Sequence, residues 1–210
     1  MGTVEHIAPL IAVARHRLAV DGQGVTTLVA FHGCTLHCRY CLNAHCLRPD
    51  GLWRTVTPKN LLDEVMIDNL YFLATSGGIT FGGGEPAIRS EFIEDFCRIA
   101  PPEWHITMET ALNVERHHLE RLLPYIHEFY IDIKDTNPEI YRRYTGQDNR
   151  RMLDNLQWLL QHDGMADRIV VRVPHIPDFN TDEDVCRTRD YLTSLGITRI
   201  DEFTYQRRTH

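Results

Sequence analysis

The sequence predicts an α/β fold built on a mostly parallel sheet, and two patterns along its 210 residues indicate it. Short runs rich in β-branched and aromatic residues alternate with longer stretches of helical periodicity. Strands that alternate with helices form parallel pairs joined by right-handed crossovers. Six such strands are too few for a closed eight-stranded barrel. We therefore expect a partial (β/α)6 TIM-like barrel or an open curved sheet, with residues 1–210 forming a single domain.

Six strands are expected from the β-branched and aromatic runs. They cover residues 26–31, 78–81, 105–108, 128–133, 168–173 and 199–204. The carboxyl ends of parallel strands meet at one edge of a sheet, and ligands bind there. We therefore expect the polar residues that end or follow these strands to form the functional site.

Four helices are expected between the strands. Thr57 is suited to cap the first of them and Pro58 to begin it, and one apolar stripe extends it to residue 73. That stripe consists of Leu61, Leu62, Val65, Met66, Leu70 and Leu73. Similar patterns predict helices over residues 91–99 and 151–161. Thr181 and Asp184 have the spacing of a capping box, which predicts a helix that ends near residue 195.

The composition limits the class of protein. The formal net charge of −7 at pH 7 argues against a general nucleic-acid binder, which would carry a basic face. No apolar stretch is long enough to span a bilayer, and the apolar run at residues 7–14 has no basic leader. Four of the six cysteines lie between Cys34 and Cys46, too close together for an ordinary disulfide framework. We therefore expect a cytoplasmic protein with no membrane or nucleic-acid partner, whose clustered cysteines bind metal.

Three of these cysteines, Cys34, Cys38 and Cys41, follow the first predicted strand with the spacing C-x3-C-x2-C. We call this segment the cysteine loop. Thiolates are the usual protein ligands of iron–sulfur clusters. Three thiolates would leave one iron of a [4Fe–4S] cluster open, much as a catalytic zinc keeps an open position. The spacing therefore favours a reactive redox centre over a structural one.

Two other interpretations of the cysteine loop remain open. Zinc would form a closed four-ligand site if Cys46, His32, His37 or His45 joined the three cysteines. Alternatively, the loop is purely structural and its thiols are buried. As a fourth ligand Cys46 would close an iron–sulfur cluster, and we expect it instead to be a thiol beside the cluster.

Several stretches around the cysteine loop share a recognisable pattern. They include residues 76–86, which end in Gly-Gly-Gly-Glu-Pro, and residues 130–134, which end in Asp-Ile-Lys, with further matches at 20–24, 144–146 and 170–174. With the cysteine spacing, they resemble the radical S-adenosylmethionine (SAM) superfamily. Within it, the chain resembles the glycyl-radical-enzyme activating enzymes of the pyruvate formate-lyase activating type.

The resemblance implies an anaerobic radical SAM oxidoreductase with one [4Fe–4S] cluster. Such an enzyme cleaves SAM reductively to a 5′-deoxyadenosyl radical, here expected to install a glycyl radical on a partner enzyme. A flavodoxin- or ferredoxin-type protein would supply the electron. One cluster is expected because residues 47–56 leave no room for a ferredoxin-like insert. No side chain beyond the cluster ligands is expected to be catalytic, because the cofactor carries the chemistry.

Two other activities remain possible. One is a radical SAM enzyme that acts on a small molecule, as the deazaguanine synthases do. The other is a zinc-binding module without catalysis.

The resemblance also implies a set of SAM-binding residues. Gly83, Gly84 and Glu85 would hold the methionine amine, with Glu109 near the same ammonium. Lys134 would pair with the SAM carboxylate. The remaining expected contacts are Tyr40, Leu42, Asn43, Asp132, Ile133, Arg172 and Gln206. A monovalent cation near Glu109, Thr110 and Asp132 is a further expectation.

The residues themselves leave alternatives for the two basic side chains. Lys134 and Asp132 alternate along one strand and can form a local ion pair. Arg172 lies among valines and needs a partner, since an unpaired buried charge is costly. Either a ligand or an internal aspartate can provide that partner.

Overall fold

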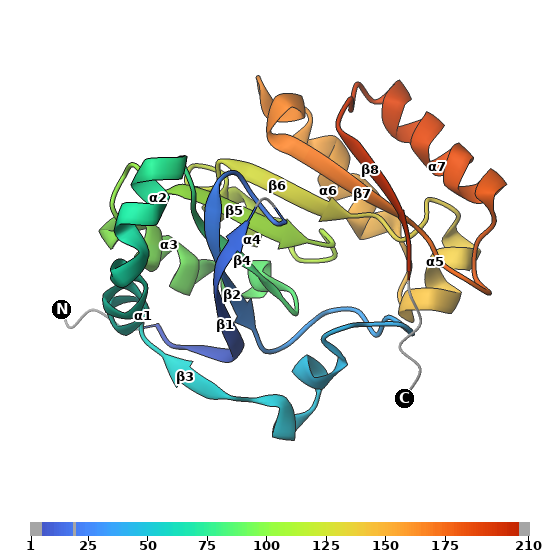
Figure 1. Cartoon of the computed structure of the whole chain (residues 1–210). Coiled ribbons are helices and arrows are strands. Elements are labelled where there is room, and N and C mark those ends of the chain that lie inside the picture. The colour runs from blue at the N-terminus through green and yellow to red at the C-terminus, as the bar shows by residue number, and fades with distance from the viewer. Residues whose placement is uncertain (1–5, 19, 206–210) are drawn as a thin grey trace. The chain divides into compact units, whose positions relative to one another are not determined.

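A computed structural model describes residues 6–18 and 20–205 of the chain. It divides into two compact units (Figure 1). Unit 1 comprises Met1–Cys34, His45–Glu109 and Glu115–Glu128, and unit 2 comprises Thr35–Ala44, Thr110–Val114 and Phe129–His210. The single domain expected over residues 1–210 stays a prediction.

Unit 1 contains the strands in the order β3-β1-β2-β4-β5. The pairs β2–β4 and β4–β5 are parallel, whereas β1 runs antiparallel to both β2 and β3. The strand bounds are β1 (Ala8–Leu18), β2 (Val25–Phe31), β3 (Arg54–Val56), β4 (Gly78–Gly83) and β5 (His105–Thr110). The register aligns the ends of β2 and β4, because Phe31 pairs with Gly83.

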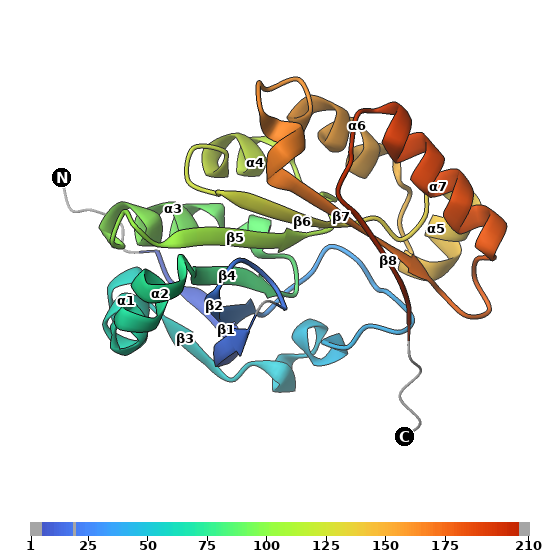
Figure 2. The ribbon, with the colours of Figure 1, turned by 45° about the horizontal axis from the view of Figure 1, so that its top comes forward.

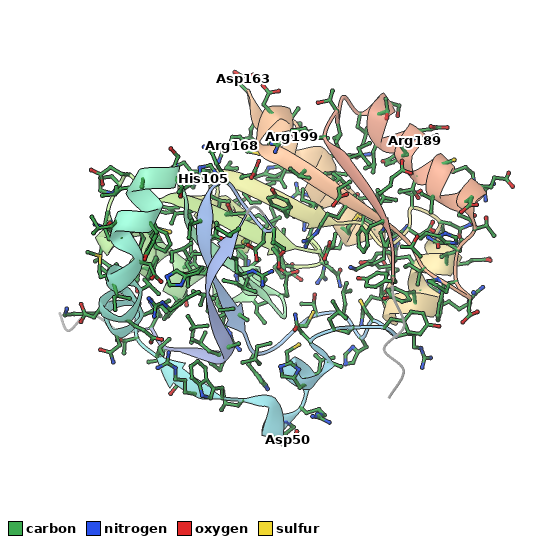
Figure 3. The ribbon with its side chains drawn as sticks, viewed as in Figure 1. Asp50, His105, Asp163, Arg168, Arg189 and Arg199 are labelled. Carbon is green, nitrogen blue, oxygen red and sulfur yellow. The ribbon has the colours of Figure 1, made fainter. Side chains whose placement is uncertain are left out.

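The helices of unit 1 are α1 (Pro58–Val65), α2 (Asn69–Thr75), α3 (Ser90–Ile99) and α4 (Arg116–Leu122), with short 3-10 turns η1 (Ala44–Leu47), η2 (Pro49–Gly51), η3 (Met66–Asp68) and η4 (Pro86–Arg89). Figure 2 shows α2 beside β4. Asp50 marks the outer tip of η2 in Figure 3. The core contains four phenylalanine rings whose neighbouring centroids are 5.5–5.7 Å apart, namely Phe31, Phe81, Phe92 and Phe96.

Unit 2 is built on the parallel strands β6 (Glu128–Asp132), β7 (Ile169–His175) and β8 (Ile200–Thr204). Its helices are α5 (Pro138–Thr145), α6 (Arg150–Leu159) and α7 (Asp182–Ser194), with the 3-10 turn η5 (Met165–Arg168). Helix α7 runs alongside β7 in Figure 1. Within the described ranges, no helix is both long and apolar enough to cross a membrane.

The predicted α/β class with mostly parallel strands is confirmed. All six predicted strands are present, as β2, β4, β5, β6, β7 and β8, with ends shifted by at most two residues. The sequence analysis missed β1 and β3, because both pair antiparallel with their neighbours and follow no strand–helix alternation. It also missed α4 and α5, although Asn137 as cap and Pro138 at the first position mark the start of α5.

The predicted helix over residues 58–73 is confirmed at Pro58–Val65 and again from Asn69 as α2, but it is not continuous, because η3 interrupts it at Met66–Asp68. Thr57 does cap α1 and Pro58 does begin it, but the 3-10 turn η3 then breaks the helical phase. Asp68 turns inward as a result, and Leu70 is left 78% exposed. The stripe fails because Asp68 is held inside by Arg15 at 2.7 and 2.5 Å and by His16 at 2.8 Å.

The other predicted helices are confirmed within two residues as α3, α6 and α7. The capping box is present at the start of α7, where Thr181 and Asp184 bond to each other's backbone amides. Gly196 follows α7 with φ of 87°, the left-handed conformation that ends helices.

Candidate functional site

In unit 1, the turn that leads into the cysteine loop is tied to its surroundings by backbone bonds. The amide of Gly33 donates to the carbonyl of Cys46 at 2.8 Å, and the amide of Glu85 donates to the carbonyl of Gly33 at 2.8 Å. The amide of Gly84 donates to the carbonyl of Phe31 at 2.9 Å. Cys34, which follows this turn directly, is therefore held next to the glycine-rich segment at the end of β4.

Backbone conformation and close packing within unit 1 require glycine at residues 82–84. Gly83 has φ of 94°, and a Cβ on Gly84 would collide with the carbonyl oxygen of Gly33. A Cβ on Gly82 would press on the Glu109 carboxylate, so the structure brings Glu109 against this segment. The predicted role of Gly83 and Gly84 in binding the SAM amine is untested, because close packing alone requires these glycines.

Glu85 is a buried carboxylate at the start of η4, with only 1% of its surface exposed. Its Oε1 accepts a bond from the amide of Ala87 at 3.2 Å, which caps this short turn. The structure therefore assigns it a local structural bond, and its contact with SAM stays a prediction.

In unit 2, the middle of the cysteine loop is docked on the last turn of α5. The amide of His37 donates to the carbonyl of Thr145 at 2.9 Å, and the amide of Arg39 donates to that of Tyr144 at 3.1 Å. These carbonyls lack partners within their helix, as the last carbonyls of any helix do. The Tyr-Thr-Gly match at residues 144–146 thus holds the loop that carries Cys38 and Cys41.

Tyr40 is anchored by its ring and its hydroxyl. The ring meets Tyr144 and Phe179 edge-on, with centroids 6.1 and 5.6 Å away. The hydroxyl donates to the Asp178 carboxylate at 3.0 Å. Tyr40 therefore has a packing role, and its predicted contact with SAM stays a prediction, as do those of Leu42 and Asn43.

Asp132 joins the two predicted basic residues of unit 2 into one charged group. Arg172 Nε donates to Asp132 Oδ1 at 2.7 Å, and Lys134 Nζ lies 3.3 Å from Asp132 Oδ2. Lys134 also donates to the hydroxyl of Tyr205 at 2.9 Å. The internal aspartate anticipated for Arg172 is thus Asp132, and Tyr205 is a member that the sequence analysis missed because a lone tyrosine near a strand end has no distinctive pattern.

The pKa directions follow from this arrangement. Burial alone would raise the pKa of Asp132, but Lys134 and Arg172 bring it below its ordinary value. Burial opposes the charge of Lys134, and Asp132 nevertheless raises the pKa of Lys134 well above its ordinary value. Both groups are therefore ionised at neutral pH. Burial raises the pKa of Cys38 to about 11, against the opposing field of Lys134.

The remaining predicted residues are less well defined. Ile133 is fully buried, and its amide donates to the Arg172 carbonyl at 3.1 Å. Gln206 lies outside the described residues. Both carboxylate oxygens of Asp132 already contact a cationic side chain. The monovalent cation expected near Asp132 therefore stays a prediction.

The cysteines have the chemistry that a sulfur-ligated cluster needs. None of the six forms a disulfide, and Cys34, Cys38 and Cys41 are half-buried whereas Cys46 is fully buried. The hydroxyl of Thr35, next to Cys34, is buried without a hydrogen-bond partner among the described residues. Within the described residues, no three acidic, histidine or cysteine side chains are already arranged to hold a metal ion. The donor set thus fits a cluster, and the assignment of the three ligands rests on their spacing.

Comparison with known proteins identifies the family. Residues 28–192 match the profile of the Radical SAM superfamily. The chain belongs to this superfamily. It is therefore an enzyme of the radical SAM class, for which a [4Fe–4S] cluster and SAM are the implied cofactors.

Curated relatives of this radical SAM enzyme are activating enzymes. It is 29% identical over 191 residues to the pyruvate formate-lyase 1-activating enzyme of Escherichia coli K12, covering 89% of this chain and 76% of that protein. It is 32% identical over 181 residues to the (2S)-3-sulfopropanediol dehydratase activating enzyme of Klebsiella oxytoca, covering 83% and 55%. The enzyme is therefore of the glycyl-radical activating type.

Solved structures support the fold. Streptococcus suis SuiB superposes with a TM-score of 0.64 at 14% identity, over 85% of this chain and 39% of that one. The protein anSMEcpe with bound AdoMet gives a TM-score of 0.55 at 16% identity, over 82% and 49%. At such identities the likeness shows the radical SAM fold alone.

Proposed function

We propose that this radical SAM enzyme cleaves SAM reductively and installs a glycyl radical on a partner protein. The observation that carries the proposal is the cysteine loop: three half-buried cysteines at the spacing C-x3-C-x2-C, with the fourth nearby cysteine fully buried. The named relatives, which activate pyruvate formate-lyase and sulfopropanediol dehydratase, support the choice of a protein substrate.

Cys34, Cys38 and Cys41 would hold the cluster. When bound, a [4Fe–4S] cluster and SAM supply a one-electron cleavage of the sulfonium that yields the 5′-deoxyadenosyl radical, which takes a hydrogen atom from the partner's glycine. The protein supplies position. The backbone bonds at Gly33 hold the first cysteine, and those from the α5 carbonyls hold the segment that carries the other two.

Lys134 is suited to bind a carboxylate. Its side chain is 6% exposed, and its ammonium remains charged because Asp132 lies beside it. Arg172 shares the same aspartate, so an incoming SAM carboxylate would meet a group that carries more positive than negative charge. Glu109, beside Gly82, offers the opposite charge for the SAM amine in unit 1.

The alternatives have different support. Membership of a superfamily of enzymes argues against a zinc-binding module without catalysis. A small-molecule substrate remains a distinct outcome of the experiment. A flavodoxin- or ferredoxin-type donor remains part of the proposal.

The test is anaerobic reconstitution with iron and sulfide, followed by reduction with dithionite and addition of SAM. We expect iron and sulfide in equal amounts and formation of 5′-deoxyadenosine. Adding a glycyl-radical enzyme encoded by a neighbouring gene should then give the doublet of a glycyl radical in electron paramagnetic resonance. Zinc without sulfide would refute the cluster, and radical chemistry on a small molecule without the doublet would refute the protein substrate.

A further inference from the structure

The guanidinium of Arg89 is partly buried and forms no ion pair with a carboxylate among the described residues. Its Nη2 donates to the carbonyl of His32 at 3.3 Å, and its Nε is buried without a hydrogen-bond partner. Among the described residues, no acidic side chain acts on its charge. Burial accordingly lowers the pKa of Arg89, and no neighbouring anion offsets this effect.

Several other partly buried arginines among the described residues are paired with a carboxylate. Arg172 is paired with Asp132, and Arg54 is paired with Glu64. Arg121 lies 3.1 Å from Glu94. An unpaired buried charge is costly, so a position that keeps one usually has an anion to meet.

The place of Arg89 indicates which anion that is. It ends η4, directly after the Gly-Gly-Gly-Glu-Pro turn, and its Nη2 lies 3.4 Å from the point where a Cβ on Gly33 would stand. Gly33 immediately precedes Cys34, the first ligand of the proposed cluster. A fixed positive charge therefore lies under the turn that presents Cys34.

We propose that Arg89 compensates the charge of the iron–sulfur cluster and raises its reduction potential. The inference rests on the proposed function, since it requires the cluster at Cys34. A cluster held by thiolates is anionic and gains a further negative charge when reduced, so a nearby cation favours the reduced form. Net charge and hydrogen bonds to sulfur are among the properties that set such potentials.

A purely structural role makes a different prediction. If Arg89 only ties down the His32 carbonyl, a glutamine amide can make the same bond without the charge. The potential would then be unchanged in Arg89→Gln.

The experiment measures the midpoint potential of the reconstituted cluster in wild type, Arg89→Gln and Arg89→Lys, by titration with dithionite and redox mediators. Iron and sulfide content and the absorption spectrum establish loading in each protein. We expect a more negative potential for Arg89→Gln and a potential close to wild type for Arg89→Lys. The matched control is Arg98→Gln, which removes the same charge from the far end of α3, where Arg98 pairs with Glu94 at 2.7 Å.

The outcomes separate the two proposals. A wild-type protein that holds no four-iron cluster refutes the proposed function itself. A loaded wild type whose potential equals that of Arg89→Gln refutes the role of Arg89 alone, and so does an equal shift in Arg98→Gln.

A further variant keeps the test decisive if Arg89→Gln does not load. In Arg89→His the charge depends on pH, with an ordinary imidazole pKa of about 6.5. We expect its potential to become more negative than that of wild type as the pH rises from about 6 to about 8. A pH dependence identical to that of wild type would contradict the proposal.

Discussion

Asp132 is the residue that allows two basic side chains to coexist in unit 2. Its two oxygens contact Arg172 and Lys134, at 2.7 and 3.3 Å. Without the carboxylate, the two cations would face each other in a largely buried setting, since Lys134 is only 6% exposed. Breaking a buried ion pair by removing one partner is far more damaging than losing an exposed pair.

Asp132→Asn should therefore lower the free energy of unfolding by about 3 kcal/mol, because both cations lose their counter-charge. Urea denaturation of the cluster-free protein measures this directly. Asp63→Asn is the matched control, since Asp63 pairs with Lys59 at the surface and should show no measurable change. A variant as stable as wild type would mean that the two cations do not depend on Asp132.

Three of the four clustered cysteines should be required for SAM cleavage, and the fourth should not. Cys34→Ala, Cys38→Ala and Cys41→Ala should each abolish formation of 5′-deoxyadenosine from SAM, because each removes a cluster ligand. Cys46→Ala should retain it, because Cys46 is fully buried and not needed as a ligand. Product analysis by chromatography and the iron content of each variant check this division. Full activity in any of the first three variants would refute the ligand assignment.

At the scale of elements, local signals predicted where helices begin but not how far they extend. The caps at Thr57 and Thr181 are both present. The phase change at η3 could not be predicted, because it depends on Arg15 and His16 from β1. The register of β1 shifts between Ala14 and Arg17, and His16 takes a positive φ of 56°. Arg15 and His16 thereby reach Asp68, which lies more than fifty positions later in the sequence.

The capping box of α7 gives a direct test at this scale. Thr181→Ala removes the bond that the amide of Asp184 donates to Thr181 Oγ1 and should destabilise the protein by about 1 kcal/mol. Thr193→Ala, within the last turn of the same helix and exposed, should be neutral or slightly stabilising, because alanine is the better helix former. Thermal unfolding of both variants compares them, and equal stability of the two would argue against the cap.

For the whole molecule, pattern and spacing predicted the α/β class, six strands and the cysteine loop. Those features depend on residues close together in sequence. The roles of Arg89 and Tyr205 could not be predicted, because they depend on which groups the fold places beside them. Tyr205 accepts a bond from Lys134, whereas Arg89 bonds only to a backbone carbonyl among the described residues. The strands β1 and β3 escaped because antiparallel additions follow no helical crossover.

The pH dependence of stability is a further property of the whole molecule. Burial, and then the neighbouring His127, lowers the pKa of His105 at the start of β5 (Figure 3). The unfolded chain therefore binds a proton more readily, and stability should fall as the pH drops below about 6.5. In His105→Gln this loss should be smaller. Melting temperatures between about pH 8 and about pH 5.5 test this, and parallel curves for the two proteins would exclude His105 as a source.

Within the cysteine cluster, Cys46 is fully buried whereas the other three cysteines are half-buried, and this difference affects how the protein should be stored. Oxidation by air follows thiolate character and access to sulfur, so among these four cysteines damage should begin at Cys34 and Cys41, come later at Cys38, whose pKa burial raises to about 11, and spare Cys46. An aged sample would then keep its circular dichroism spectrum and its melting curve while failing to take up iron. Correct folding would be a misleading sign of quality, and a count of reactive thiols would be the better one.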